Sequence, residues 1–440
     1  MVAVVVAAGL IAASSYVLRG SGAVDRAPVA ADSTAIEILE TSASSDEVAR
    51  LIPVFEARIR ANTDALDYRF LGGLYLQRAR ANGDVADYVR SGAALERSLE
   101  LRPADLETRA SLATLRYATH DFAGALALAR AILAEEPSAL SAIAIVGDAQ
   151  LELGDYAAAA DNYDFLARSV PNVAAVDARL ARLAFLRGAP TVARDLAARA
   201  FMEARSEGAF AAGLAWYAHL EAQLALDRGD YEAAVAHEDE ALAAAPAYHV
   251  SLAGLARVRA AQGHDAEAIA LYTQAIAVSP QPDYLSQLGD LQALTGEEAR
   301  ARDDYGAVEA IATLAAANRQ LYDRQLALFY ADHDMRSADA VAMAQASLER
   351  RADIYGHDVY AWALYKSGAY GAARASADRA VALGTPDARL WYHAGMISIA
   401  LGEIGRARAE LRRALETNPN FDPLQARRAR AALSSLAAAP

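Results

Sequence analysis

The hydrophobic pattern divides the chain into a short uninterrupted apolar stretch and a long remainder in which apolar and polar positions are mixed. Val2–Leu18 contains no charged side chain. As a helix it would span roughly 26 Å, the short end of what crosses a bilayer. Gly20–Asp32 then has the composition of a flexible linker. Ser45–Ala61 has the pattern of an amphipathic helix that enters the folded part of the chain.

Prolines that close a helix recur at one interval along the remainder of the chain. Pro103, Pro137 and Pro171 are equally spaced, and Pro246 and Pro280 are separated by the same interval. Proline suits the connection to a following helix pair, because it cannot continue an existing helix. The interval therefore predicts a series of helical units of constant length.

Glycines at the turn between two helices keep the same interval, to within one position, independently of the prolines. They fall into three runs: Gly154 and Gly188; Gly229, Gly263 and Gly296; Gly368 and Gly402. Glycine supplies the left-handed backbone conformation that ends a helix. Two markers that keep one period across about 350 residues predict an array of helix-turn-helix repeats.

The residues between these markers resemble the tetratricopeptide repeat (TPR) family. The copies that carry the resemblance are Trp391, Gly395, Gly402, Ala407, Ala414 and Pro419; Val146, Gly147, Gly154, Asp155, Tyr156, Ala160, Tyr163 and Pro171; Leu255, Ala256, Gly263, Ala268, Tyr272, Ala275 and Pro280; and Gly229, Asp230, Tyr231, Ala234, Ala241 and Pro246. The resemblance implies an all-α fold, an α-α superhelix (solenoid) of about ten TPR-like repeats between Ala65 and Pro419. The eighth repeat departs from the pattern, with Asp334 where the turn glycine belongs.

We expect six segments along the chain. They are 1–19, an apolar membrane anchor or signal segment; 20–44, a linker; 45–207, N-terminal TPR-like repeats; 208–355, central repeats; 356–422, C-terminal repeats; and 423–440, a capping helix with arginines on its exposed side. The terminal helices are expected because end repeats need a polar outer face.

The apolar N-terminus has three possible roles. A single-pass anchor is favoured over a signal peptide, although small residues would allow cleavage after Ala23 or Ala31. A buried helix of the solenoid is the third reading. The segment lacks a preceding basic stretch, and Arg19 is only a weak orientation signal. We therefore expect a membrane-anchored or exported protein, extracytoplasmic and of bacterial type, that contacts the membrane only through this segment.

Composition and charge exclude several classes of function. The net charge is −14 and Lys366 is the only lysine, which argues against a nucleic-acid partner because such proteins need a basic face. The absence of cysteine excludes disulfides, thiolate nucleophiles and Cys-ligated zinc. Alanine, the best helix former, supplies much of the 55% hydrophobic content.

Catalytic and metal-binding motifs are missing from the sequence. The eight histidines are scattered, and no His-Glu-x-x-His helix exists. Asp332-His333-Asp334 is interpreted as a solvated loop, and His237–Glu240 as an exposed charged face. Gly72-Gly73 lies inside a helical pattern and is interpreted as a packing site, not a phosphate loop. We expect no catalytic residue, no cofactor, no metal and no enzyme activity.

The resemblance implies that the first helices of successive pairs line a concave groove. Its candidate partner-binding residues are Tyr355, Trp362 and Tyr365 in the ninth repeat and Arg389, Tyr392 and Met396 in the tenth. Such a cluster suits an extended peptide or an amphipathic helix. The alternative is that these side chains pack between repeats.

The expected function is a non-catalytic scaffold that binds a polypeptide in its groove. By resemblance, candidate roles are envelope assembly, secretion and pilus-type biogenesis. A second hypothesis is support of glycan or polysaccharide export, with aromatic residues that stack on sugars. The Lys-then-Asn pair by which chaperone-binding family members clamp a terminal carboxylate is absent: the corresponding positions are Arg69/Gly73, Ala110/Thr114, Ala144/Asp148 and Ala253/Arg257.

Overall fold

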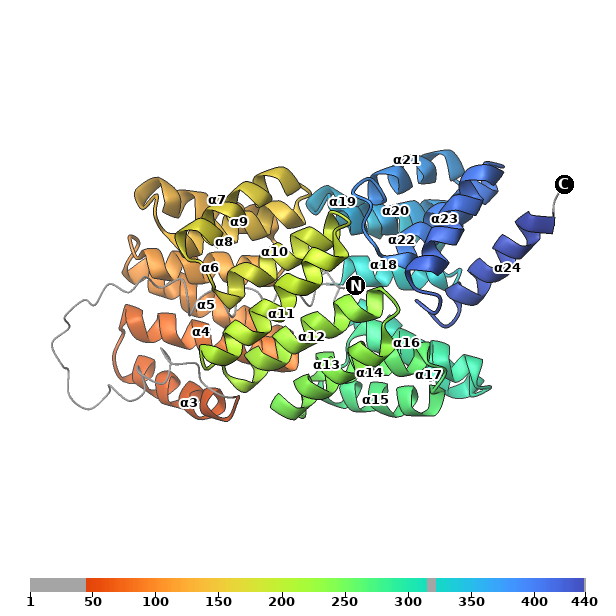
Figure 1. The fold of residues 1–440 in the computed structure, drawn as a ribbon. Helices are drawn as coiled ribbons and strands as arrows, with labels where there is room; N and C mark the ends of the chain where they lie inside the picture. Colours follow the sequence, from red (N-terminus) through yellow and green to blue (C-terminus); the bar gives the residue numbers. More distant parts are fainter. Residues whose placement is uncertain (1–44, 315–321, 439–440) are drawn as a thin grey trace.

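The computed structural model describes residues 45–314 and 322–438 (Figure 1). The anchor or signal segment 1–19 and the linker 20–44 lie outside the described residues. Within the described ranges the chain forms 22 helices and no strand, which confirms the all-α prediction. None of these helices combines the length and the apolarity that a bilayer crossing requires.

The helices are numbered as in Figure 1. In chain order they are α3 (Ser45–Ala61), α4 (Ala65–Asn82), α5 (Val85–Leu101), α6 (Leu106–Ala118), α7 (Phe122–Glu135), α8 (Leu140–Glu152), α9 (Tyr156–Ser169), α10 (Ala174–Leu186), α11 (Pro190–Ser206), α12 (Ala211–Asp227), α13 (Tyr231–Ala244), α14 (His249–Ala261), α15 (Asp265–Val278), α16 (Pro282–Leu294), α17 (Glu298–Leu314), α18 (Asp323–Asp332), α19 (Ser337–Arg350), α20 (Ile354–Lys366), α21 (Tyr370–Ala380), α22 (Ala388–Ala400), α23 (Ile404–Thr417) and α24 (Gln425–Ala438).

Helices α4 to α23 form ten consecutive pairs, from α4–α5 to α22–α23, and α3 and α24 flank them. This number confirms the prediction of about ten repeats. The first helices of neighbouring pairs contact one another, as α12 contacts α14 and α20 contacts α22. They form an inner layer and are buried on nearly all sides, whereas the second helices form the outer layer.

Local sequence chemistry starts and stops these helices. Asp121, Asp155 and Asp230 precede the second helices of the second, third and fifth pairs, and each side chain accepts a hydrogen bond from a backbone N–H of the first turn. In the eighth pair Asp334 occupies the turn with a φ of +54°, because a short polar side chain tolerates the left-handed region better than most. The missing turn glycine therefore leaves the helix pair intact.

The pairs wind into a superhelix whose neighbouring turns touch, so that the third and fourth pairs lie beside the ninth and tenth (Figure 1). The Ile354 backbone N–H donates to the Tyr156 hydroxyl at 2.9 Å, and the Thr385 hydroxyl donates to the Leu186 carbonyl at 2.6 Å. At Gly154 a Cβ atom would come 2.5 Å from the Ala352 carbonyl oxygen. Glycine thus serves there both the helix turn and the close approach between superhelical turns.

Candidate functional site

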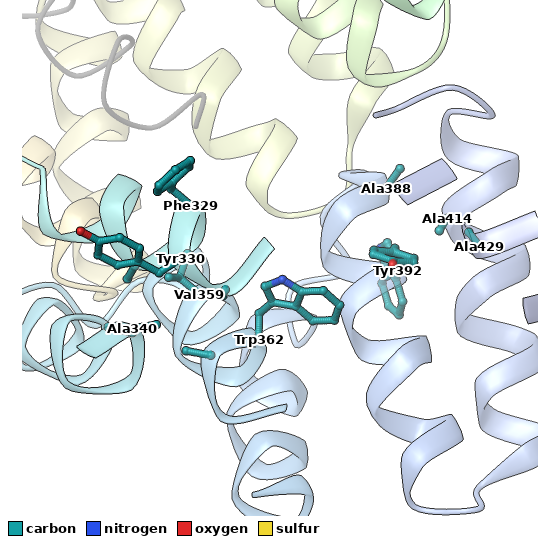
Figure 2. Close-up of a cluster of buried hydrophobic side chains, with 14 of the residues drawn as sticks. Phe329, Tyr330, Ala340, Val359, Trp362, Ala388, Tyr392, Ala414 and Ala429 are labelled. Carbon is teal, nitrogen blue, oxygen red and sulfur yellow. The ribbon is translucent and has the colours of Figure 1, made fainter. Parts of the chain in front are cut away.

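The aromatic residues predicted for the groove gather where the last three pairs meet. The Trp362 indole stacks between Tyr365, with ring centroids 4.8 Å apart, and His393, at 4.1 Å. Tyr392 lies 5.7 Å from Trp362 and 5.6 Å from Phe421 on its other side. Figure 2 shows Trp362 projecting toward the helix that carries Tyr392.

Polar bonds hold this cluster in one arrangement. The Trp362 Nε1–H donates to Asp332 Oδ1 at 2.7 Å, and the Gln425 side-chain amide donates to the same oxygen at 2.8 Å. Asp332, Trp362 and Gln425 belong to α18, α20 and α24, so one carboxylate links two pairs to the capping helix. Burial raises the pKa of Asp332.

The six candidate groove residues differ in how accessible they are. Trp362 and Tyr392 are each 1% exposed, and Tyr355 is also buried. The burial of these three residues agrees with the alternative that they pack between repeats. The others, Tyr365, Arg389 and Met396, are half-buried. They are the members of the set that keep part of their surface exposed.

Arg389 lines a small polar cavity between superhelical turns, beside the aromatic cluster. The cavity, of about 20 Å³, is lined by Asp227, Arg257, Asp387, Ala388, Arg389, Asn418 and Phe421. That volume holds about one water molecule, which makes it too small for a cofactor. Asp227 and Arg257 come from α12 and α14, far from Arg389 in the sequence, and no local pattern could associate them.

The charges at this cavity shift one another's ionisation. Burial, reinforced by the nearby Asp387 carboxylate, raises the pKa of Asp227 to about 7. Burial opposes the charge on Arg389, but the carboxylates of Asp387 and Asp422 outweigh it and raise its pKa. Asp227 is therefore a carboxyl group that titrates near neutral pH.

Because of this shift, the stability of the protein should depend on the ionisation of Asp227. Its pKa is higher in the folded than in the unfolded chain, so the folded state binds more protons and stability falls as the pH rises from about 4 to 7. We expect Asp227→Asn to remove this dependence. The free energy of unfolding of the variant, measured relative to that of wild type, should increase by on the order of 2–4 kcal/mol between pH 4 and pH 8.

Urea denaturation at both pH values measures this effect. Asp161→Asn, on the exposed side of α9, is the matched control and should show no such gain. A difference between Asp227→Asn and wild type that does not change with pH would contradict the assignment.

A buried ion cluster joins the two superhelical turns elsewhere. Glu152 of α8 pairs with Arg182 of α10 and with Arg351, which precedes α20. Asp353 accepts from Arg324 at 2.6 Å and lies 3.3 Å from Arg351. Each of these acids is paired with arginines. The cluster therefore acts as a structural clamp between repeats that lie far apart in the sequence.

Two interpretations of charged segments are corrected by the structure. Asp332 and His333 are not a solvated loop: Asp332 is hydrogen-bonded inside the aromatic cluster, and His333 Nε2 lies 2.8 Å from Asp290 Oδ1. His237–Glu240 is not wholly an exposed face either. Glu238 is 1% exposed and its Oε1 lies 2.8 Å from His219 Nδ1, because helical geometry turns one residue of such a run toward the neighbouring helix.

The stacked pairs define a protein of the helical-solenoid class, whose members generally bind other proteins. The pair formed by α22 and α23 identifies the kind of repeat. The family model described as Tetratricopeptide repeat matches residues 388–421, and the turns and small crossing residues of the other pairs follow the same order. Residues 388–421 are thus a tetratricopeptide repeat, and the fold of the described chain is that of a solenoid of such repeats.

The chain is similar to several solved structures at low sequence identity. No curated protein matches the sequence. Cut9–Hcn1, an APC/C hetero-tetramer, is 14% identical with a TM-score of 0.33, over 91% of this chain and 95% of that chain. A tetratricopeptide repeat protein from Parabacteroides merdae ATCC 43184 is 16% identical with a TM-score of 0.40, over 57% and 96%. MamA is 17% identical with a TM-score of 0.33, over 39% and 97%.

Proposed function

We propose that the protein is a non-enzymatic scaffold that binds a polypeptide partner on the C-terminal part of its inner layer. The observation that carries the proposal is a strip of half-buried apolar side chains, Tyr365, Met396 and Ile399, on α20 and α22. Their inner sides contact the core cluster around Trp362, and their outer sides are left for a partner. Apolar anchors of this kind supply most of the energy of a protein interface.

The strip is held rigidly before any partner arrives. Tyr365 stacks on Trp362 at an interplanar angle of 14°, and Trp362 is fixed by its bond to Asp332. Lys366 Nζ lies 5.2 Å from the Trp362 ring and 2.6 Å from Asp334 Oδ1. Because these side chains are already ordered, a partner would lose little additional conformational entropy on binding.

The place of action belongs to the same proposal. Val2–Leu18 supports a single-pass anchor or an export signal. With the solenoid displayed at or beyond a bacterial-type membrane, the scaffold would serve envelope assembly, secretion or pilus-type biogenesis. The segment is the only support for this location.

A second candidate function is support of glycan export. Tyr370 is 39% exposed and lies 5.7 Å from Tyr365, ring centroid to centroid. An exposed tyrosine beside a partly exposed one provides a surface on which a sugar ring can stack. The nature of the captured molecule decides between the two functions.

Site-specific cross-linking in cells tests the proposal. A photoreactive amino acid at Met396 should capture one defined polypeptide, and Met396→Glu in a chain that carries the photoreactive group at Ile399 should reduce that capture at least about tenfold, because a charge would be buried in the interface. Met202→Glu is the matched control: Met202 of α11 is 61% exposed on the outer layer, and capture should be unchanged.

The outcomes separate the two functions. Undiminished capture of the same polypeptide by a folded Met396→Glu chain would contradict partner binding at this strip. Circular dichroism shows whether the variant is folded. Capture of a carbohydrate in place of a polypeptide would replace the scaffold by the glycan function.

A further inference from the structure

Three potential metal ligands converge on the fifth helix pair. They are Glu221 of α12 and His237 and Glu240 of α13, and one ligand atom from each lies within 4.8 Å of the others. We propose that these side chains bind a divalent transition-metal ion of the Zn²⁺ class. This site goes beyond the scaffold function and does not depend on it.

Helical geometry explains why these residues meet. His237 and Glu240 are three residues apart on α13 and therefore lie on one face of that helix. Glu238, between them in the sequence, turns into the core, where its carboxylate meets His219. The buried pair fixes the rotation of α13 about its axis, so that His237 and Glu240 border α12 at the position of Glu221.

Glu221 is the member of the group whose carboxylate is most buried and has little compensating charge nearby. Its side chain is 9% exposed. Its Oε2 lies 3.4 Å from His237 Nδ1, and within the described part of the chain it forms no ion pair with an arginine or lysine. A carboxylate buried in this way is unfavourable unless a charge or donors compensate it. A metal ion held jointly with His237 and Glu240 would provide that compensation.

The surrounding charge favours a cation over any other ligand. Residues 211–314 contain sixteen Asp and Glu but five Lys and Arg. Arg205 pairs with the cluster, with its Nη1 3.9 Å from Glu240 Oε1, and both side chains are exposed. An exposed ion pair at that distance is weak, so it would yield to a divalent ion.

The donor set selects the class of metal. One imidazole nitrogen and two carboxylate oxygens suit Zn²⁺ and neighbouring transition metals, whereas Ca²⁺ and Mg²⁺ prefer sites made of oxygen atoms alone. Three protein ligands leave a further position for water. Tetrahedral Zn²⁺ needs ligand atoms about 3.4 Å apart, a spacing that small side-chain rotations of the exposed Glu240 and half-buried His237 can reach.

Titration of the full-length protein with Zn²⁺, after removal of bound metal by a chelator, tests the site. We expect one Zn²⁺ per chain by isothermal calorimetry. Affinity should fall at least about tenfold in Glu221→Gln and in His237→Ala, because each removes a ligand. His264→Ala removes an exposed histidine beside Asp265 and Glu267, so it is the matched control and should bind as wild type does.

Thermal melting gives a second reading of the same site. Zn²⁺ should raise the melting temperature of the wild type and not that of Glu240→Gln, whose exposed side chain can be changed without disturbing the core. Mg²⁺ at the same concentration should have no effect. No binding at Zn²⁺ concentrations up to about 100 µM, or equal binding by wild type, Glu221→Gln and Glu240→Gln, would overturn the proposal.

Discussion

Replacing Glu152 by alanine is expected to cost on the order of 3–5 kcal/mol of unfolding free energy. Glu152 is fully buried and compensates Arg182 and Arg351, so its removal leaves two buried cations without their acid. Arg351 also lies 3.3 Å from Asp353, but this carboxylate already pairs with Arg324. The remaining carboxylate therefore cannot neutralise all three arginines.

Chemical denaturation followed by circular dichroism measures this loss. Glu135→Ala is the control, since Glu135 forms an exposed ion pair with Arg109, and pairs of that kind contribute about 0–1 kcal/mol. Because Glu152 clamps the third and fourth pairs to the ninth, the variant should also show a larger radius in small-angle scattering. Similar stability for the two variants would show that the buried cluster is not a clamp.

The second large effect is expected for Trp362→Ala, at about 3–5 kcal/mol. The indole fills the space between Tyr365 and His393, and its removal leaves a cavity in the core that joins the last three pairs. The substitution also takes away the indole donor from the buried Asp332. Since repeats are stabilised by their neighbours, the loss should appear first as unfolding of the C-terminal pairs.

Comparison with two tyrosine variants separates folding from binding. Tyr370→Ala removes an exposed ring at the edge of the stack and should leave stability within about 0.5 kcal/mol of wild type. Tyr365→Ala should weaken partner capture strongly and lower the free energy of unfolding only slightly. Trp362→Ala should reduce both together, and a fully stable Trp362→Ala protein that fails to bind would instead place the indole in the interface.

Much of the architecture could be predicted because it depends on local chemistry. The recurring glycines mark turns that need a left-handed backbone, as Gly154 and Gly402 show with φ values of +84° and +75°. The amphipathic pattern of Ser45–Ala61 coincides with α3. Even the departure at Asp334 was visible in the sequence, and the turn formed there as it did in the other pairs.

The accessibility of the candidate site could not be predicted in the same way. Trp362 and Tyr365 follow the same repeat pattern, yet one is buried and the other half-buried. Burial on the inner layer depends on how far each pair is rotated against the next and on contacts with distant helices, such as the hydrogen bond from Gln425 of α24 to Asp332. A repeat pattern contains no direct record of that rotation.

The sequence by itself determined the repeat, the helices and the composition of the inner layer, because each follows from interactions within one or two pairs. Only the tertiary structure decided which residues of distant pairs meet: the clamp of Glu152 and Arg351, and the cavity shared by Asp227 and Arg389. The reason is that small rotations between pairs accumulate along a solenoid. Contacts between its superhelical turns depend on their sum, which no single repeat specifies.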